Sequence, residues 1–386
     1  MMDNTTNNII NNLHNDFREL YEKEPSIYYS PGRVNLIGEH TDYNCGFVMP
    51  FAINMGTYIA IAKRDDDLVR VYSKNLNEKK SFILEEVQEK IINSWDNYIK
   101  GVFNIIAKDY GKKIQGVDIY IYSDLPFGAG LSSSASLATA LAFAYNNLLN
   151  LGLKDIELAT AAQQVEHRYI GTNCGLLDQM ACILSKEDMT TMIDCNTYEH
   201  KNIPLNLEEL TLLIVDTNIK HNLAESAYND RRKTCENIAR FNNIKSLREL
   251  NIENLTVTKE SFSKDDYSLA KHIYTENQRV LDAAKAMKDK NWKKLGELMY
   301  QSHYSLKDDY KVSCNELDYL VVLSESFDGV HGARMTGGGF GGSTIHLVPK
   351  KVVEEYKAYL EKNYYDRFKI KPLFYMSKAC NGTHKI

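Results

Sequence analysis

The sequence has few of the features that mark disulfide-stabilised or membrane-spanning proteins. Its 386 residues include only 7 cysteines, which are scattered and form no C-x-x-C pair. An odd number of scattered cysteines indicates neither a disulfide framework nor a zinc ribbon. No apolar run approaches the ~18 residues of a membrane span, and the Asn/Thr-rich N-terminus lacks the basic and apolar regions of a signal peptide. We therefore expect a cytoplasmic protein that binds no membrane.

Positive charge is also too sparse for a nucleic-acid-binding protein. The 46 basic residues are outnumbered by 51 acidic residues, which gives a formal net charge of −5. Nucleic-acid binders carry clustered Lys and Arg, and no such block is longer than three residues here. The expected partner is therefore a small molecule.

The hydrophobic pattern predicts an α+β protein in two parts. At about 150 residues per domain, the length is sufficient for two domains. Residues 117–122 and 211–215 have the pattern of strands, whereas residues 135–149 are rich in Ala and Leu and predict a helix. The polar helical pattern at 265–293 predicts a structural arm or lid without chemistry. No repeat of 20 to 50 residues is visible, and we place the domain boundary between residues 195 and 196.

A Gly/Ser-rich loop at residues 126–135 lies where the strand at 117–122 leads into the following helix. Glycines allow close approach of the backbone, and the unpaired N–H groups and positive dipole of a helix N-terminus favour an anion. The loop lacks the Gly-x-x-x-x-Gly-Lys-Ser/Thr pattern of a common P-loop, so charge neutralisation would come from the helix and a metal. An ordinary turn capping a helix would also explain it.

A second glycine-rich segment, residues 337–342, contains five glycines in six residues. It matches Gly-x-Gly-x-x-Gly formally, but the dinucleotide motif needs a helix after it and residues 343–348 alternate like a strand. Close approach of this backbone to a ligand or another loop is one interpretation, and a flexible linker is the other.

A polar segment at residues 32–44 places Arg, Glu, His and Asp beside the apolar stretch 47–53. Glu39, His40 and Asp42 could supply the donors and acceptors that a sugar's hydroxyls require. The same residues could form a metal site or a solvated turn, although their spacing differs from the usual helical ligand pairs.

Together, the three segments 32–50, 125–137 and 335–343 resemble the three signature motifs of the GHMP small-molecule kinase family, in the same order. The first motif is similar to that of the family's galactose-phosphorylating branch. The resemblance implies an α+β fold of two lobes, each with mixed sheet and helices, and an active site in the cleft between them. By analogy, the last strand, at about 371–376, would pack back on the first lobe.

The resemblance also implies roles for individual residues. Asp178 matches the family's general base beside the anomeric hydroxyl, and Arg33 matches the arginine that stabilises the charge developing during transfer. A mechanism that uses Arg33 without proton abstraction by Asp178 remains open. Asp42 would help to read the axial 4-hydroxyl. The positions that contact the sugar correspond to Arg33, Glu39, His40, Asp42, Gly175, Asp178 and Tyr228.

ATP and Mg²⁺ are the cofactors that the resemblance implies. Ser134 and Glu166 match the family's magnesium ligands, since this hard cation prefers oxygen donors. Trp95 resembles a residue near the adenine pocket, although a core tryptophan is equally compatible. The predicted nucleotide-binding residues are Gly128, Ala129, Gly130, Leu131, Ser132, Ser133, Ser134, Ala135, Ser73 and Trp95.

The implied reaction is transfer of the ATP γ-phosphate to the C1 hydroxyl of D-galactose, the first committed step of galactose catabolism, by a monomeric enzyme. Two alternatives stay open: a kinase for a related sugar, such as N-acetylgalactosamine, galacturonate or arabinose, and a non-catalytic regulator that senses galactose and ATP. Such regulators have a shortened phosphate loop, whereas residues 128–136 are complete here. The sequence therefore favours an active enzyme.

Overall fold

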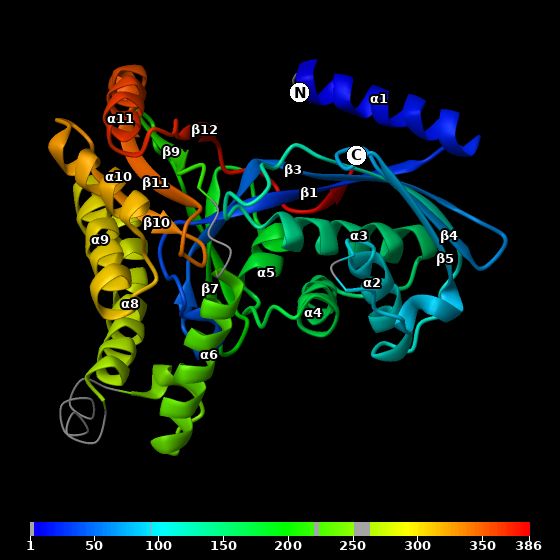
Figure 1. The fold of residues 1–386 in the computed structure, drawn as a ribbon, viewed down its shortest axis with the longest axis horizontal. Coiled ribbons are helices and arrows are strands. Elements are labelled where there is room, and N and C mark those ends of the chain that lie inside the picture. Colours follow the sequence, from blue (N-terminus) through cyan, green and yellow to red (C-terminus); the bar gives the residue numbers. More distant parts are fainter. Residues whose placement is uncertain (1–3, 93, 220–223, 251–262) are drawn as a thin grey trace.

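A six-stranded sheet dominates the first half of the chain in the computed structural model, which describes residues 4–92, 94–219, 224–250 and 263–386. The strand order is β13-β1-β3-β6-β4-β5. Figure 1 labels β1, β3, β4 and β5 of this sheet. The strands are β1 (Ser26–Asn35), β3 (Pro50–Lys63), β4 (Leu68–Ser73), β5 (Glu78–Ile83), β6 (Val117–Ser123) and β13 (His384–Lys385). All neighbours are antiparallel except β4 and β6, which pair in parallel around the helix that connects them.

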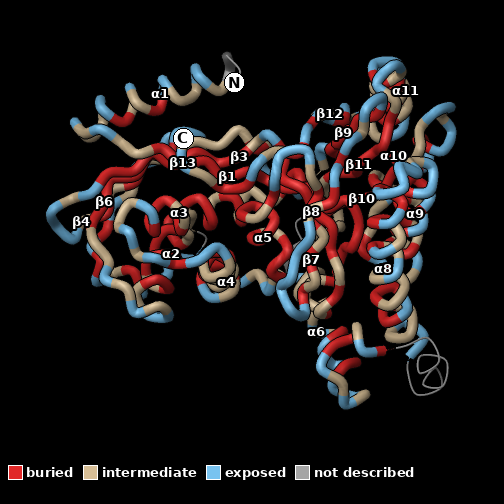
Figure 2. Tube along the Cα trace, turned by 180° about the vertical axis from the view of Figure 1, so that it is seen from behind, coloured by how far each residue is buried: buried red, intermediate tan, exposed pale blue. Residues whose placement is uncertain are grey.

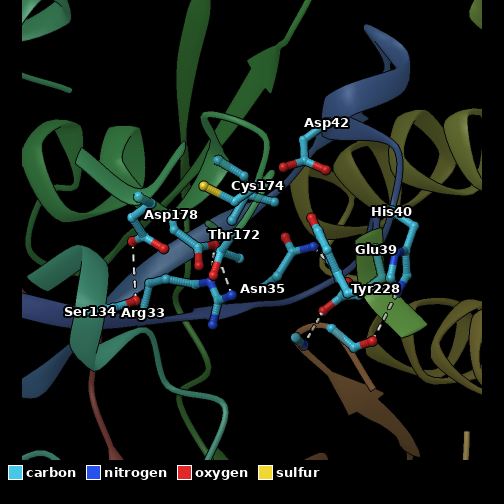
Figure 3. Close-up of a pocket in the computed structure, with 14 residues that line it drawn as sticks. Arg33, Asn35, Glu39, His40, Asp42, Ser134, Thr172, Cys174, Asp178 and Tyr228 are labelled. Atoms are coloured by element: carbon cyan, nitrogen blue, oxygen red, sulfur yellow. Dashed lines mark hydrogen bonds and ion pairs between the residues drawn. The ribbon is translucent and has the colours of Figure 1, made fainter. Parts of the chain in front are cut away.

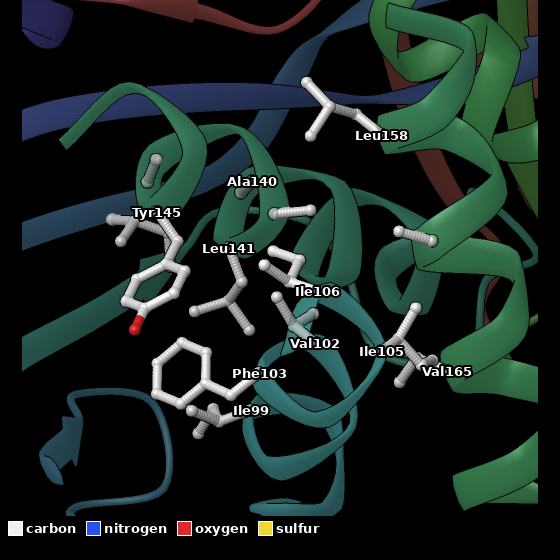
Figure 4. Close-up of a cluster of buried hydrophobic side chains, with 14 of the residues drawn as sticks. Ile99, Val102, Phe103, Ile105, Ile106, Ala140, Leu141, Tyr145, Leu158 and Val165 are labelled. Carbon is white, nitrogen blue, oxygen red and sulfur yellow. The ribbon is translucent and has the colours of Figure 1, made fainter. Parts of the chain in front are cut away.

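Both faces of this sheet are covered, because alternate residues of its strands are apolar on each side. Tyr29 and Tyr58 face helix α1 (Asn4–Tyr21), whereas Tyr28 and Ile59 face a layer of four helices on the other side. The four helices are α2 (Asn97–Lys108), α3 (Ser133–Leu149), α4 (Asp155–Val165) and α5 (Leu177–Leu184). Figure 4 shows where these helices meet, with Phe103 stacked on Tyr145.

A four-stranded sheet with the order β10-β11-β9-β12 forms the second lobe. Its strands are β9 (Leu210–Asp216), β10 (Gly332–Thr336), β11 (Ser343–Pro349) and β12 (Leu373–Ser377). Leu213 and Val215 face helices α10 (Asn315–Ser326) and α11 (Val353–Phe368). Leu212 and Ile214 face a core shared with helices α8 (Lys264–Lys288) and α9 (Trp292–Tyr304). Helix α6 (Ala224–Phe241) packs on α8.

The two lobes share one hydrophobic core. Val34 on β1 and Phe51 on β3 pack in the same cluster as Leu212, Val280 and Leu298 from the second half of the chain. A small sheet of β2 (Phe47–Val48), β7 (Met189–Asp194) and β8 (His200–Pro204) also crosses the expected boundary at 195/196. Figure 2 shows buried segments along β1 and β3 and along β9 and β11. The junction is therefore packed, and the cleft walls are held at a fixed separation.

The structure confirms most of the elements predicted from the sequence. The strands at 117–122 and 211–215 are β6 and β9, and the glycines at 337–342 lie between β10 and β11. Helix α3 begins at Ser133, two residues before the predicted start, because Ser133 and Ser134 form its first turn. No described helix is both long and apolar enough to span a membrane.

The strand expected at about 371–376 is β12, whose last residue bonds the first lobe through Ser377 Oγ, which donates to Asn54 Oδ1 on β3 at 3.0 Å. Strand β12 pairs with β9 and completes the second-lobe sheet. Pairing with first-lobe strands follows at Ala379, which bridges Ile53 on β3, and at β13, which pairs with β1 through Tyr28 with Lys385 and Tyr29 with His384. The family analogy placed a strand at about 371–376 but cannot show which sheet has a free edge for it.

The Phe103 cluster gives a test of the first-lobe core. Phe103 is fully buried, with its ring 4.3 Å from that of Tyr145. We expect Phe103→Ala to lower the free energy of unfolding by about 3 to 5 kcal/mol, because it removes buried apolar surface and leaves a cavity. The control Phe241→Ala changes a ring that is 69% exposed, and should cost under about 0.5 kcal/mol. Urea unfolding of both variants measures the difference, and equal losses would contradict the assigned core.

Candidate active site

Three adjoining cavities run along the cleft. The first, of about 180 Å³, is lined by the polar segment near the N-terminus, by Asp178 and by Tyr228. The second, of about 620 Å³, is lined by both glycine-rich segments and shares Arg33, Asp178 and Glu166 with the first. A third, of about 230 Å³, adjoins the second at Ser133 and Ser134. Figure 3 shows the first cavity, with Asp178 and Arg33 on one side and His40 and Tyr228 on the other.

Arg33 connects the first two cavities. It lies on β1 next to a register shift in the β1–β3 pairing, and its side chain is almost fully buried. Its Nε donates to Asp178 Oδ1 at 2.8 Å, and a second guanidinium nitrogen donates to the carbonyl of Gly130 at 2.8 Å. Ser132 Oγ donates to the other oxygen of Asp178 at 2.5 Å. The Asp178 carboxylate, in the first turn of α5, is therefore fixed against the phosphate loop by two donors.

Glu166 and Ser134 meet on the wall of the second cavity. Glu166 begins a π-helical turn (Glu166–Ile170) after α4, and Ser134 Oγ donates to its Oε1 at 3.1 Å. The amide of Gln179 is the other donor, at 3.3 Å. Burial, with the nearby Asp178 carboxylate as a smaller cause, raises the pKa of Glu166 to about 7. Both donors to the carboxylate are therefore neutral, and no cationic side chain of the described residues forms an ion pair with it.

This pair of oxygen donors fits Mg²⁺. The cation prefers oxygen ligands in octahedral geometry and usually takes a few from protein and the rest from phosphate and water. A cation beside Glu166 would also supply the positive charge that its buried carboxylate lacks. No group of three or more His, Cys, Asp or Glu side chains suited to a metal occurs in the part of the chain that the structure describes. The metal would therefore depend on phosphate oxygens for most of its coordination.

Asp42 lies on the opposite side of the first cavity, at the start of a short 3-10 helix (Asp42–Asn44). A Cβ atom built on Gly175 would stand 1.8 Å from its Oδ2, so only glycine fits at that position. Burial raises the pKa of Asp42 to about 6, and the Asp178 carboxylate adds to the effect. Gly175 therefore shapes the cavity by allowing Asp42 to approach, although it does not itself line the cavity.

Glu39 lines the first cavity but has four protein partners. Its Oε2 accepts from the amide of Asn35 at 2.6 Å and pairs with Arg334 at 2.8 Å. Its Oε1 accepts from the backbone N–H of Gly337 at 2.8 Å and from the Thr336 hydroxyl at 3.2 Å. Despite these partners, burial raises its pKa above the usual range. Glu39 therefore joins the N-terminal polar segment to the second glycine-rich segment.

His40 and Tyr228 complete the wall of the first cavity. The His40 ring lies 5.4 Å from the Tyr228 ring, centroid to centroid. A Cβ atom on Gly338 would stand 3.2 Å from the Tyr228 ring, so the glycine leaves room for this tyrosine. Burial lowers the pKa of His40 to about 3, which keeps its imidazole neutral.

The two glycine-rich segments contact each other through their backbones. Gly130, at φ +74°, lies against Gly337, where a Cβ atom would stand 3.1 Å from the Gly130 carbonyl oxygen. Ser343 Oγ donates to the carbonyl of Ala129 at 2.7 Å. This close approach is the reason for glycine here, and it supports the loop-to-loop interpretation over a flexible linker.

Most of the residues predicted to bind the nucleotide line one of two cavities, and two of them line neither. Most residues of the phosphate loop line the second cavity, at the N-terminus of α3, and Ser73 and Trp95 line the third. Trp95 is half-buried, and its Nε1 donates to Glu78 at 2.8 Å. Ala129 and Ala135 are fully buried and do not line these cavities, so they contribute packing instead. The loop residues that line the second cavity are Gly128, Gly130, Leu131, Ser132, Ser133 and Ser134.

Sequence reasoning missed the support that α8 gives to the site. Glu276 Oε1 accepts from the Gly38 backbone N–H at 2.9 Å, and His272 Nε2 contacts the Glu39 carbonyl oxygen at 3.2 Å. Both side chains are fully buried. They occupy the same helix face as Leu269, Ile273 and Val280, and polar residues on an apolar stripe were the available signal. Arg334, which pairs with Glu39, gave no comparable signal. Its strand, β10 (Gly332–Thr336), is too short to show an apolar pattern that a buried arginine would interrupt.

Comparison with known proteins places these features in a family. Residues 15–63 match the family described as the galactokinase galactose-binding signature. Residues 97–186 match the GHMP kinases N-terminal domain, and residues 283–366 match the GHMP kinases C-terminal domain.

Curated relatives and solved structures agree with these matches. A galactokinase from Actinobacillus succinogenes is 42% identical, covering 96% of this chain and 97% of its own, and one from Clostridium perfringens is 40% identical, covering 98% and 100%. The crystal structure of Lactococcus lactis galactokinase complexed with galactose matches with a TM-score of 0.94 and 37% identity, covering 98% of this chain and 100% of that chain. The Methanococcus jannaschii mevalonate kinase shares the fold, with a TM-score of 0.65 and 22% identity over 93% of this chain and 99% of its own. The chain therefore belongs to the galactokinase family of GHMP kinases.

Proposed function

We propose that this protein transfers the γ-phosphate of ATP to the C1 hydroxyl of D-galactose, forming galactose 1-phosphate and ADP with Mg²⁺ as cofactor. The observation that carries the proposal is the position of Asp178. Its carboxylate lies at the boundary between a small polar cavity and a larger cavity lined by a helix N-terminus and glycine-rich loops. A base at this boundary can meet a sugar hydroxyl on one side and a phosphate on the other.

Asp178 would accept the proton of the C1 hydroxyl as its oxygen attacks the γ-phosphorus. Arg33 holds the carboxylate in place and presents positive charge near the transferred group. The first N–H groups of α3 and the backbone of the phosphate loop would bind the phosphates, since they have no helical acceptor. Because phosphoryl transfer depends mainly on positioning and charge, these residues account for most of the required chemistry.

Mg²⁺ would be held by Glu166 and Ser134, together with phosphate oxygens and water. Bound there, it supplies positive charge to the phosphates. The sugar would occupy the first cavity, with Asp42 as an acceptor for its hydroxyls and Tyr228 as a wall. The third cavity, with Ser73 and Trp95, would take the adenine. A monomeric, cytoplasmic enzyme with no nucleic-acid partner, and the boundary at 195/196, stay predictions.

A sugar panel tests the proposed substrate. With ATP and Mg²⁺, we expect ADP release to be greatest on galactose. We expect kcat/KM for glucose to be lower by about 100-fold or more, because an inverted 4-hydroxyl would leave a buried acceptor unpaired. The panel should include N-acetylgalactosamine, galacturonate and arabinose. A higher kcat/KM on one of these would reassign the substrate, and galactose binding without turnover would indicate a sensor.

Asp178→Asn tests the base. The amide keeps the size of the side chain but cannot accept the proton, so we expect kcat to fall by roughly 10²- to 10⁴-fold with little change in ATP binding. The control Asp67→Asn changes an exposed carboxylate and should leave kcat unaltered. Steady-state kinetics and ATP titration measure both quantities. Near-normal turnover by Asp178→Asn would exclude proton abstraction and leave Arg33 as the main contributor.

Glu166→Gln tests the buried metal ligand through stability. In the metal-free protein, the raised pKa means that the folded state holds a proton on Glu166 that the unfolded chain releases near pH 4.5. The contribution of Glu166 to the free energy of unfolding therefore falls as pH rises from about 4.5 to 7, by on the order of 3 kcal/mol. We expect Glu166→Gln to lack this loss, whereas Glu187→Gln, at an exposed site, should retain it.

Urea unfolding at pH 5 and pH 8 without metal measures this difference. The same variant should need a higher Mg²⁺ concentration for half-maximal activity, because one oxygen ligand has lost its charge. An unchanged magnesium requirement would mean that the cation binds elsewhere.

A further inference from the structure

Four side chains, of which three are buried and Tyr43 is half-buried, form a hydrogen-bonded chain that ends at the first cavity. The Cys235 thiol lies 3.1 Å from the Tyr310 hydroxyl, which lies 2.8 Å from the Tyr43 hydroxyl. The Tyr43 hydroxyl lies 2.7 Å from His40 Nδ1, and His40 Nε2 lies 3.2 Å from the carbonyl oxygen of Gly338. The chain thus connects α6, the residue that follows the π turn at Ser305–Asp309, the N-terminal polar segment and the second glycine-rich segment.

One carbonyl fixes the direction of every bond in this chain. A carbonyl oxygen only accepts, so His40 Nε2 must carry the proton that meets Gly338. Because burial keeps the imidazole neutral, Nδ1 is unprotonated and accepts from the Tyr43 hydroxyl. A phenol has one proton, so Tyr43 must accept from Tyr310, and Tyr310 in turn accepts from the Cys235 thiol. Each hydrogen bond of the chain therefore has one assigned donor and one assigned acceptor.

His40 needs this restraint. Its backbone is in the left-handed region at φ +62°, which few residues with side chains adopt without support from their surroundings. Its side chain and those of Tyr310 and Cys235 are almost fully buried, so water cannot replace the missing partners. The Tyr310 ring also lies 4.8 Å from the imidazole, centroid to centroid.

Resting on the proposed function, we propose that Tyr43 and Tyr310 are positioning residues for sugar binding, which hold His40 as the Nε2-protonated tautomer and thereby fix the polar segment to Gly338. Both imidazole nitrogens are then occupied by protein partners. His40 meets the sugar as a rigid wall rather than through a free ring nitrogen. Its position beside Gly338 sets the width of the cavity between the polar segment and the second glycine-rich segment.

Tyr43→Phe tests this role directly. It removes the donor to His40 Nδ1, and a buried unpaired acceptor is costly, so we expect the galactose Kd to rise about tenfold. Tyr310→Phe removes a bond one step further away and should raise the Kd about threefold, since Tyr43 still donates to His40. The KM for ATP should change less than about twofold in both variants.

A second tyrosine–histidine pair elsewhere in the protein provides a matched control. The Tyr356 hydroxyl lies 2.7 Å from Nδ1 of the buried His346, and that ring's Nε2 lies 2.7 Å from the Thr344 hydroxyl. This pair lies between β11 and α11, away from the three cavities. Tyr356→Phe therefore removes the same kind of bond, and its galactose Kd should stay within about twofold of the wild type.

Calorimetric galactose titrations and ¹⁵N-histidine NMR separate the possible results. Wild-type His40, assigned by the signal lost in His40→Gln, should show a neutral ring protonated on Nε2, with and without galactose. A ring protonated on Nδ1, a cationic ring near pH 7, or a Tyr43→Phe variant with wild-type Kd would overturn the inference. A Tyr43→Phe Kd that rises no more than that of Tyr356→Phe would also overturn it. Wild-type protein that binds no galactose would instead overturn the proposed function.

Discussion

The site depends on the contacts of one buried guanidinium. Arg33 bonds Asp178 on α5 and the Gly130 carbonyl in the phosphate loop, while its own backbone N–H donates to the Leu131 carbonyl. These bonds fix the distance between the Asp178 carboxylate and the glycine-rich loop at 126–135. They require the loop to lie directly on β1, and Gly32 permits this, since a Cβ atom there would stand 2.6 Å from the Leu131 oxygen. The position of Asp178 against this loop therefore depends on one strand, one glycine and one guanidinium.

The charges around Arg33 are not balanced by the protein alone. Asp42 and Glu166 are buried carboxylates whose pKa values rise to about 6 and 7, in part because Asp178 is near. Ionisation of both costs free energy in the empty site and becomes favourable when a cation or hydroxyl donors arrive. Two carboxylates with raised pKa values in the wall of one cavity are typical of a functional site.

Much of this site could be predicted from the sequence, because its main residues lie in three compact segments with unusual composition. The strand, loop and helix around residues 117–149, the glycines between β10 and β11, and the side chains Arg33, Asp42 and Asp178 all follow from local patterns and family resemblance. Residues 32–44 are mostly buried, with Asp42 and Tyr43 half-buried, which excludes a solvated turn. The sheet to which β12 belongs could not be predicted, since strand alternation identifies a strand without identifying its neighbour.

Long-range polar contacts were the other part that the sequence could not supply. Glu39 is surrounded by partners from β10 and the glycine-rich segment that follows it, about 300 positions away in the chain. Removing Arg334 would leave the carboxylate buried without its cation, which costs more than the pair contributes when intact. Glu39 therefore acts mainly as a connection between segments, whatever contact it makes with the sugar. The lobes also share one hydrophobic core, so apolar packing already stabilises their junction. The polar contacts of Glu39 in addition fix the position of the N-terminal polar segment relative to β10 and the second glycine-rich segment.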